Sequence, residues 1–142
     1  MSGLSMFFKE NVEQPKNVKF VASTRFKDAK GKPMEWEIKA ITSEENEKLR
    51  KLATTRVPVK GSRNQFTQEI DMGKYQASVC AACTVYPELN NAELQDSWGA
   101  MGAEDLLTKL LLVGEYTAYT EKVFEINGFD VSDDELVEEA KN

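Results

Sequence analysis

The chain has 142 residues, of which 41% are hydrophobic and 30% are charged, with a formal net charge of −6 and no histidine. This length allows one domain with a single core. The composition excludes a disordered chain, and no apolar run approaches the roughly 20 residues that span a bilayer. The N-terminus lacks the basic region and the long apolar run of a secretory signal. We therefore expect a soluble, cytoplasmic protein with no membrane partner.

Charge is distributed unevenly along the sequence. Residues 1–70 contain 14 Lys/Arg and 9 Asp/Glu, a net of +5, whereas residues 71–142 contain 4 and 15, a net of −11. The positive excess is small and scattered, which argues against a nucleic-acid partner. Halves of opposite sign favour intramolecular docking or head-to-tail self-association, although two solvated surfaces would give the same pattern.

The first predicted element is a short amphipathic helix at the N-terminus. Leu4, Phe7 and Phe8 have helical spacing, and Pro15 follows as a helix terminator. So few residues are marginal as an isolated helix. These apolar side chains are therefore candidates for contact with a partner.

A β-hairpin followed by a helix is predicted next. Apolar and polar residues alternate in 18–26 and again in 34–40, and the intervening segment is rich in turn-forming residues. This pattern predicts a hairpin over 17–40, whose apolar face needs cover from helices or another subunit. Thr42 and Glu45 then have capping-box spacing, which predicts the start of a helix.

Residues 55–69 are predicted to form a mobile basic loop. The segment has no hydrophobic period and contains only one acid, Glu69, besides its three basic residues, Arg56, Lys60 and Arg63. Long loops without secondary structure are often functional or disordered. We expect the basic residues to contact an acidic surface of a partner or of a neighbouring copy, and a simple linker is the alternative.

The second half of the chain is predicted to be helical. About four helices are expected in 71–127, the first of them continuing to Pro87. Residues 131–142 are predicted to form an acidic C-terminal helix or tail. The predicted fold class is therefore α+β, mainly α, in a single domain over 1–130 with the N-terminal hairpin packed on the helical half.

Candidates for catalysis and metal binding are weak. Cys80 and Cys83 form a C-x-x-C motif inside a predicted helix, where they are expected to pack in the core rather than to act in redox chemistry. Without histidine there is no common general base and no ligand set to complete a zinc site. Acid pairs such as Glu104 with Asp105 lie near helix starts, where the helix dipole favours them. The sequence predicts no enzyme activity, no metal and no cofactor.

The segment LNNAELQDSWGAMGAEDLL, residues 89–107, combines a tryptophan, two glycines and four carboxylates. Trp98 is expected to anchor the core under the turn between Gly99 and Gly102. The alternative is that Trp98 and Met101 belong to a contact surface. Pattern alone does not decide between these roles.

Three longer segments carry a resemblance to a known family. YPELNNAELQDSWGAMGAEDLLTKLLLVGEY, EKVFEINGFD and, upstream, RFKDAKGKPMEWEIKAITSEENEKLRK closely resemble the XkdN-like phage tail assembly chaperones. The similarity covers roughly residues 5–130. Spacing of the Asn-Ala-Glu-Leu-Gln-Asp-Ser core makes a chance match improbable.

The resemblance implies a chaperone in the cytoplasm of the bacterial host, made by a phage or prophage. Such a protein binds the tape-measure protein while the tail tube assembles, contacts the tail tube protein in some systems, and is absent from the mature tail. A longer form can arise in such systems by ribosomal frameshifting. The family offers no catalytic residues. The alternative is a structural tail or head-tail connector protein, followed by a phage nucleic-acid regulator.

Candidate partner-binding residues are taken from the exposed apolar and basic positions expected above. They are Leu4, Phe7, Phe8, Arg56, Lys60, Arg63, Trp98 and Met101.

Overall fold

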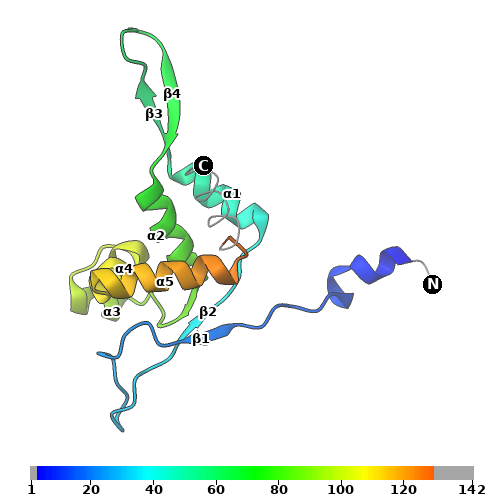
Figure 1. The fold of residues 1–142 in the computed structure, drawn as a ribbon, viewed down its shortest axis with the longest axis vertical. Helices are drawn as coiled ribbons and strands as arrows, with labels where there is room; N and C mark the ends of the chain where they lie inside the picture. The colour runs from blue at the N-terminus through cyan, green and yellow to red at the C-terminus, as the bar shows by residue number, and fades with distance from the viewer. Residues whose placement is uncertain (1–2, 130–142) are drawn as a thin grey trace, which may run out of the picture.

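The structure is a computed structural model that describes residues 3–129 (Figure 1). Its α-helices are α1 (Ser43–Leu52), α2 (Met72–Cys83), α3 (Ala92–Trp98), α4 (Ala103–Leu110) and α5 (Val113–Ile126). Its strands are β1 (Val18–Phe20), β2 (Trp36–Ile38), β3 (Thr54–Pro58), β4 (Phe66–Ile70) and β5 (Thr84–Tyr86). The predicted α+β class, with helices mainly in the second half, is confirmed. The predicted acidic helix or tail over 131–142 lies outside the described residues.

A three-stranded antiparallel sheet forms one side of the core, with strand order β1-β2-β5. The predicted hairpin pairs β1 with β2, so that Val18 faces Ile38 and Phe20 faces Trp36. Its strands are much shorter than the alternating pattern indicated. The third strand, β5, was not predicted: α2 ends at Cys83, and the next three residues are β-branched or aromatic, types that favour a strand.

Helix α2 packs against α4, α5 and strand β5, and buried side chains of these helices and of the sheet form a single core (Figure 1). At its centre Tyr119 of α5 lies edge-on against Trp36 of β2, with 5.0 Å between ring centroids. The Tyr119 hydroxyl also lies 2.6 Å from the hydroxyl of Thr84 in β5. Tyr119 therefore joins α5 to two strands of the sheet. The largest fully buried side chains are Tyr119, Ile38, Leu106, Leu107, Val79, Val123, Cys80 and Cys83.

Local sequence signals explain where the helices begin. The capping box predicted for α1 is present: the backbone N–H of Glu45 donates to the Thr42 hydroxyl, and the Glu45 carboxylate accepts from the Thr42 backbone. Asp71 caps α2, and Asn91 caps α3 in the same way. These caps fix the direction in which each helix leaves its loop.

The prediction of a mobile loop over 55–69 is wrong for most of the segment. Strands β3 and β4 pair in an antiparallel hairpin, with Thr54 opposite Ile70 and Pro58 opposite Phe66. Figure 1 shows this hairpin projecting beyond α1 and α2. Because most of its residues on both faces are exposed, its sequence has no apolar alternation, which is the signal that predicts a strand. Pro58 is tolerated because each strand of a two-stranded sheet is an edge.

The N-terminal residues form two short 3₁₀ helices, η1 (Gly3–Phe7) and η2 (Lys9–Asn11), instead of the predicted amphipathic helix. The Asn11 side chain donates to the Ser5 carbonyl over 2.7 Å and closes this turn. A segment this short does not offset the cost of α-helix nucleation. No residue of either 3₁₀ helix is buried.

Candidate partner-binding surfaces

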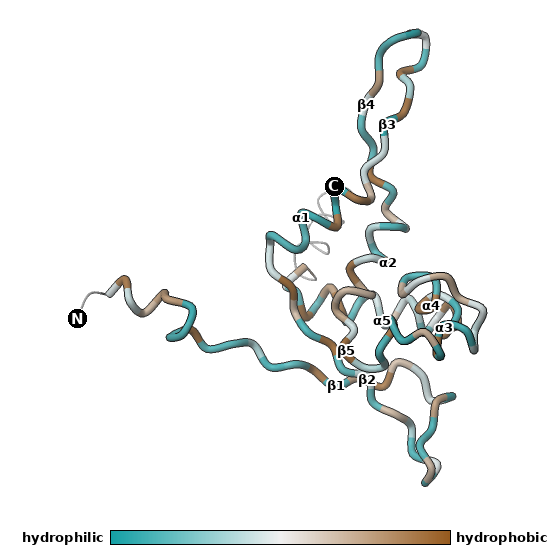
Figure 2. The backbone as a smooth tube through the Cα atoms, turned by 180° about the vertical axis from the view of Figure 1, so that it is seen from behind, coloured by the Kyte–Doolittle hydropathy of each residue, from teal (hydrophilic) through white to brown (hydrophobic). Residues whose placement is uncertain are grey.

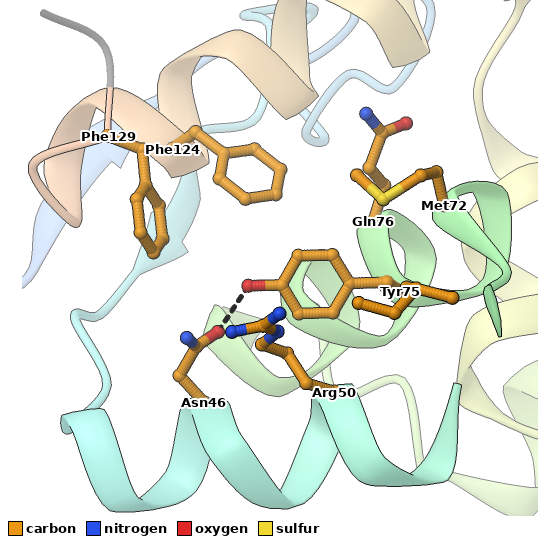
Figure 3. A pocket seen from close by; sticks show the side chains of 8 residues that line it. Asn46, Arg50, Met72, Tyr75, Gln76, Phe124 and Phe129 are labelled. Atoms are coloured by element: carbon orange, nitrogen blue, oxygen red, sulfur yellow. Dashed lines mark hydrogen bonds between the residues drawn. The ribbon is translucent and has the colours of Figure 1, made fainter. Parts of the chain in front are cut away.

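The larger candidate surface is a groove between α1, α2 and the end of α5, with a volume of about 480 Å³ (Figure 3). Three helix segments distant in sequence supply its walls. On α2 the cap at Asp71 sets the first turn, so that Met72, Tyr75 and Gln76 share one face. The groove is lined by Asn46, Arg50, Ile70, Met72, Tyr75, Gln76, Phe124 and Phe129.

An aromatic floor with a polar wall characterises this groove, which we call the Tyr75 groove. The ring of Tyr75 lies 6.3 Å from that of Phe124, which in turn lies 5.4 Å from that of Phe129. The Tyr75 hydroxyl donates to the side-chain oxygen of Asn46 on α1 (Figure 3). An apolar floor with a few fixed polar groups suits an amphipathic helix laid into a groove.

A second, smaller groove lies at the far end of the sheet. Its volume is about 160 Å³, and it is lined by Phe26, Met34, Trp36, Tyr86, Pro87, Leu94, Trp98 and Leu110. The ring of Phe26 lies between the two tryptophans, 6.4 Å from Trp36 and 6.2 Å from Trp98. We call this the Trp98 groove. All of its lining residues are apolar or aromatic, so it suits an apolar side chain rather than a charged ligand.

The expectation that Trp98 anchors the core is wrong. Trp98 is the last residue of α3 and is 36% exposed, whereas Trp36 is only 2% exposed and occupies the core position. Gly99 follows with a positive φ of 62° and ends the helix in the left-handed conformation that glycine favours. The chain turns away there, and the indole remains at the surface as one wall of the groove.

The predicted contact residues lie in three separate parts of the structure. Leu4, Phe7 and Phe8 are in the N-terminal turns, and Trp98 and Met101 flank the end of α3, where Met101 is 91% exposed. The basic residues belong to the projecting hairpin and its turn: Arg56, Lys60 and Arg63. The guanidinium of Arg56 stacks over the ring of Phe66, 4.6 Å from its centroid. The structure does not bring these three groups into one surface.

The Tyr75 groove contains none of the residues selected from the sequence. Met72 and Tyr75 lie three positions apart in α2, a spacing that in a sequence indicates a shared buried face of a helix and not a contact surface. Met72 is in fact 55% exposed. A residue such as Phe124 gave no separate signal, because periodicity shows which residues share a helix face and not which helices meet.

Glu115 at the start of α5 joins the N-terminal segment to the helical half. Its carboxylate accepts hydrogen bonds from the Ser23 hydroxyl at 2.6 Å and from two guanidinium nitrogens of Arg25 at 2.7 and 3.3 Å. It also accepts from the backbone N–H of Leu112. Arg25 further donates to the Leu110 carbonyl. The guanidinium of Arg25, followed by the Ser23 hydroxyl, lowers the pKa of Glu115 from its ordinary value of 4.5 to about 2.

The prediction that Cys80 and Cys83 pack in the core is confirmed, since both are fully buried free thiols. Burial raises the pKa of Cys80 to about 11, so its reactive thiolate is scarce at neutral pH. Replacing both by alanine is expected to lower the free energy of unfolding by on the order of 1–3 kcal/mol through lost packing. Urea unfolding measures this loss, and iodoacetamide labelling of the native chain is expected to be slow. A double variant of unchanged stability that loses partner binding would contradict the packing role.

Membrane-spanning helices and metal-binding clusters were sought in residues 3–129, the range that the structure describes. No helix in this range is long and apolar enough to cross a membrane. No group of three or more Cys, Asp or Glu side chains in the same range is placed to hold a metal ion.

Comparison with known protein families shows to which family the chain belongs. The family described as phage XkdN-like tail assembly chaperone protein matches residues 4–141. The chain belongs to this family. Tail assembly chaperones have a non-catalytic role.

Relatives of this tail assembly chaperone include two proteins of Bacillus subtilis strain 168. The phage-like element PBSX protein XkdN is 31% identical over 140 residues, and the protein YqbN is 34% identical over 140 residues. Each alignment covers 98% of this chain and 93% of the relative. The crystal structure of the protein YqbN has a similar fold, with a TM-score of 0.77, 29% sequence identity, and coverage of 92% of this chain and 99% of that one.

Proposed function

We propose that the chain binds the tape-measure protein of its phage or prophage while the tail tube assembles, and that it leaves before the tail is complete. The observation that carries the proposal is the open aromatic Tyr75 groove in a member of the tail assembly chaperone family. A tape-measure protein is long, helical and apolar, so it aggregates unless its exposed surface is covered. A chaperone prevents this aggregation by covering the exposed apolar surface until the tail tube encloses it.

The shape of the Tyr75 groove supports binding to a helix. Its floor of Tyr75, Phe124 and Phe129 offers aromatic surface to apolar side chains at positions i, i+3, i+4 and i+7 of a partner helix. Arg50 and Gln76 provide polar groups beside this floor, and a guanidinium nitrogen of Arg50 donates to the Glu47 carboxylate over 3.3 Å. The groove therefore suits reversible cover of a helix better than permanent burial.

The test uses Met72, which lines the groove and is the first residue of α2. Co-expression with the tape-measure protein of the same phage or prophage is expected to keep that protein soluble and to co-purify it with the wild-type chain. Met72→Glu places a charge on the groove and is expected to abolish co-purification. A helix N-terminus tolerates a carboxylate, so the fold is expected to persist.

Val113→Glu is the matched control. Val113 is likewise the first residue of a helix, α5, and is 86% exposed, but it does not line the Tyr75 groove. This variant is expected to co-purify the tape-measure protein like the wild type. Equal binding by both variants would exclude the groove as the contact. Mass spectrometry of purified tails is expected to lack the chain, and its presence in stoichiometric amounts would support a structural tail or connector protein instead.

A further inference from the structure

The N-terminal arm, residues 3–17, exposes apolar side chains that the chain's own body does not cover. Phe7 is 80% exposed, Met6 64% and Phe8 50%. Single exposed apolar residues are ordinary on protein surfaces, but neighbouring ones in one segment mark an interaction site. Within residues 3–129, which the structure describes, these side chains stay exposed and are available to form one side of an interface.

Hydrogen bonds shape the arm before it binds anything. The Phe8 N–H donates to the Ser5 carbonyl over 3.1 Å, and the Asn11 N–H donates to the Phe8 carbonyl over 2.8 Å. The Asn11 side chain adds its bond to the Ser5 carbonyl. A segment that is already turned loses less conformational entropy on docking than an extended one.

The Trp98 groove matches the arm in size and chemistry. Its volume of about 160 Å³ is close to the ~150 Å³ of an apolar cavity that holds one benzene molecule. A phenylalanine ring is the corresponding side chain, and Phe7 is the most exposed phenylalanine of the arm. The aromatic walls formed by Phe26, Trp36 and Trp98 favour tilted or edge-on contact with such a ring.

The arm and the groove lie at opposite ends of the body. The arm leaves from β1 and runs away from α3 and α4, as the two opposite views show (Figure 1, Figure 2). The groove is walled by residues of α3 and α4, including Trp98 and Leu110. Because the two features lie at opposite ends, the arm of one molecule can reach the groove of a second molecule that is stacked head to tail on the first.

We infer that the N-terminal arm of one copy inserts the phenyl ring of Phe7 or Phe8 into the Trp98 groove of a second copy. Each buried phenylalanine removes roughly 150–250 Å² from water. Phe8 is already half buried and the groove has room for one ring, so even with Met6 and Leu4 the arm offers less than the ~800 Å² per partner of a standard interface, which predicts a weak and reversible contact. The contact is heterologous, so it propagates head to tail into a ring or an open row of copies.

A row of copies suits cover of a long extended partner, because each copy then protects one stretch of it. That biological meaning rests on the proposed function. Self-association is measured on the purified chain without the tape-measure protein, so a failure to bind that protein would not count against the self-association inferred here. A failure of self-association likewise leaves one-to-one tape-measure binding possible.

The first experiment is sedimentation velocity of the full chain over a range of concentrations. Phe7→Ser with Phe8→Ser is expected to weaken self-association on the order of thirtyfold, as truncation of aromatic hot-spot residues does. Phe7 is 80% and Phe8 50% exposed, so the fold is expected to be unchanged. The lining residues of the Trp98 groove are all apolar or aromatic, so a rise in salt is expected to leave self-association at the wild-type level. Loss of self-association in high salt, or on the triple change of Arg56, Lys60 and Arg63 to Ser, would instead support the contact between copies that the charge pattern of the sequence favours.

Mixing variants tests the head-to-tail geometry. Trp98→Glu blocks the groove but leaves the arm intact, and Met34→Glu does the same from another wall if the first variant folds poorly. Groove-blocked and arm-deficient chains are each expected to be monomeric, and a mixture of the two is expected to give one dimer that grows no further. Val113→Glu, on an exposed side chain outside the groove, is the control and is expected to associate normally.

Three results would overturn the inference. One is self-association of the arm-deficient chain at wild-type strength. Another is loss of association in the triple hairpin variant or in high salt, which would assign the contact to charge. The third is a wild-type chain that stays monomeric while removal of the arm exposes the Trp98 groove to an apolar dye, which would show that the arm covers its own groove.

Discussion

Replacing Trp36 by alanine is expected to lower the free energy of unfolding by about 3–5 kcal/mol, the range for a large aromatic side chain truncated in a core. Trp36 is 2% exposed and lies in the central strand of the sheet, between β1 and β5. Its indole contacts the rings of Tyr119 and Phe26. The cavity left by truncation would remove packing from both the sheet and α5.

Trp98→Ala is the internal comparison, because it removes the same side chain from the surface. With 36% of Trp98 exposed, its truncation is expected to cost roughly 1–2 kcal/mol, which is below the loss expected at Trp36. Urea unfolding followed by circular dichroism measures both variants on one scale. If Trp98→Ala lowered the free energy of unfolding more than Trp36→Ala, Trp98 and not Trp36 would be the tryptophan that anchors the core.

Fold class was predictable because several independent signals agreed. Alternation marked the pairing of β1 with β2, the capping box at Thr42 marked α1, and apolar stripes marked the helices of the second half. The buried Cys80 and Cys83 followed from their place inside a helix. In each case a local pattern reports directly on which face of one element is buried.

Elements without a buried face escaped prediction. The β3–β4 hairpin is exposed on both sides and so lacks alternation, and β5 is only three residues long and follows directly on a helix. The prediction that Trp98 is buried in the core was wrong for a related reason. A tryptophan is apolar in either position, and only the turn at Gly99 directs it outward.

The candidate surfaces were harder to predict than the fold because they form between elements. Asn46, Tyr75 and Phe124 line one groove, yet they lie on three helices and belong to separate local patterns. The Trp98 groove likewise forms between the β1–β2 hairpin and helices α3 and α4. The family resemblance indicated the role of the chain, but the tertiary arrangement was needed to show which surfaces are open.

The contact between Glu115 and Arg25 predicts a specific sensitivity to acid. The folded-state pKa of Glu115, about 2, lies below its ordinary value of 4.5, so folding favours the ionised form. The stabilisation is therefore fully present above about pH 4.5 and is lost as the pH falls toward 2. Protonation would weaken the hydrogen bonds that hold the segment around Ser23 and Arg25 against the start of α5.

Glu115→Gln removes the charge and keeps the shape of the side chain, so it separates this contact from the other carboxylates. The pKa values of Glu37, Glu45 and Asp105 are also lowered by their hydrogen-bond partners, and these groups add their own acid dependence in both proteins. The quantity to measure is the difference in urea unfolding free energy between wild type and variant at pH 6, 4.5 and 3. We expect the wild type to be clearly more stable at pH 6 and the difference to shrink toward pH 3. A difference that stays constant across this range would show that the ionised carboxylate of Glu115 does not stabilise the fold.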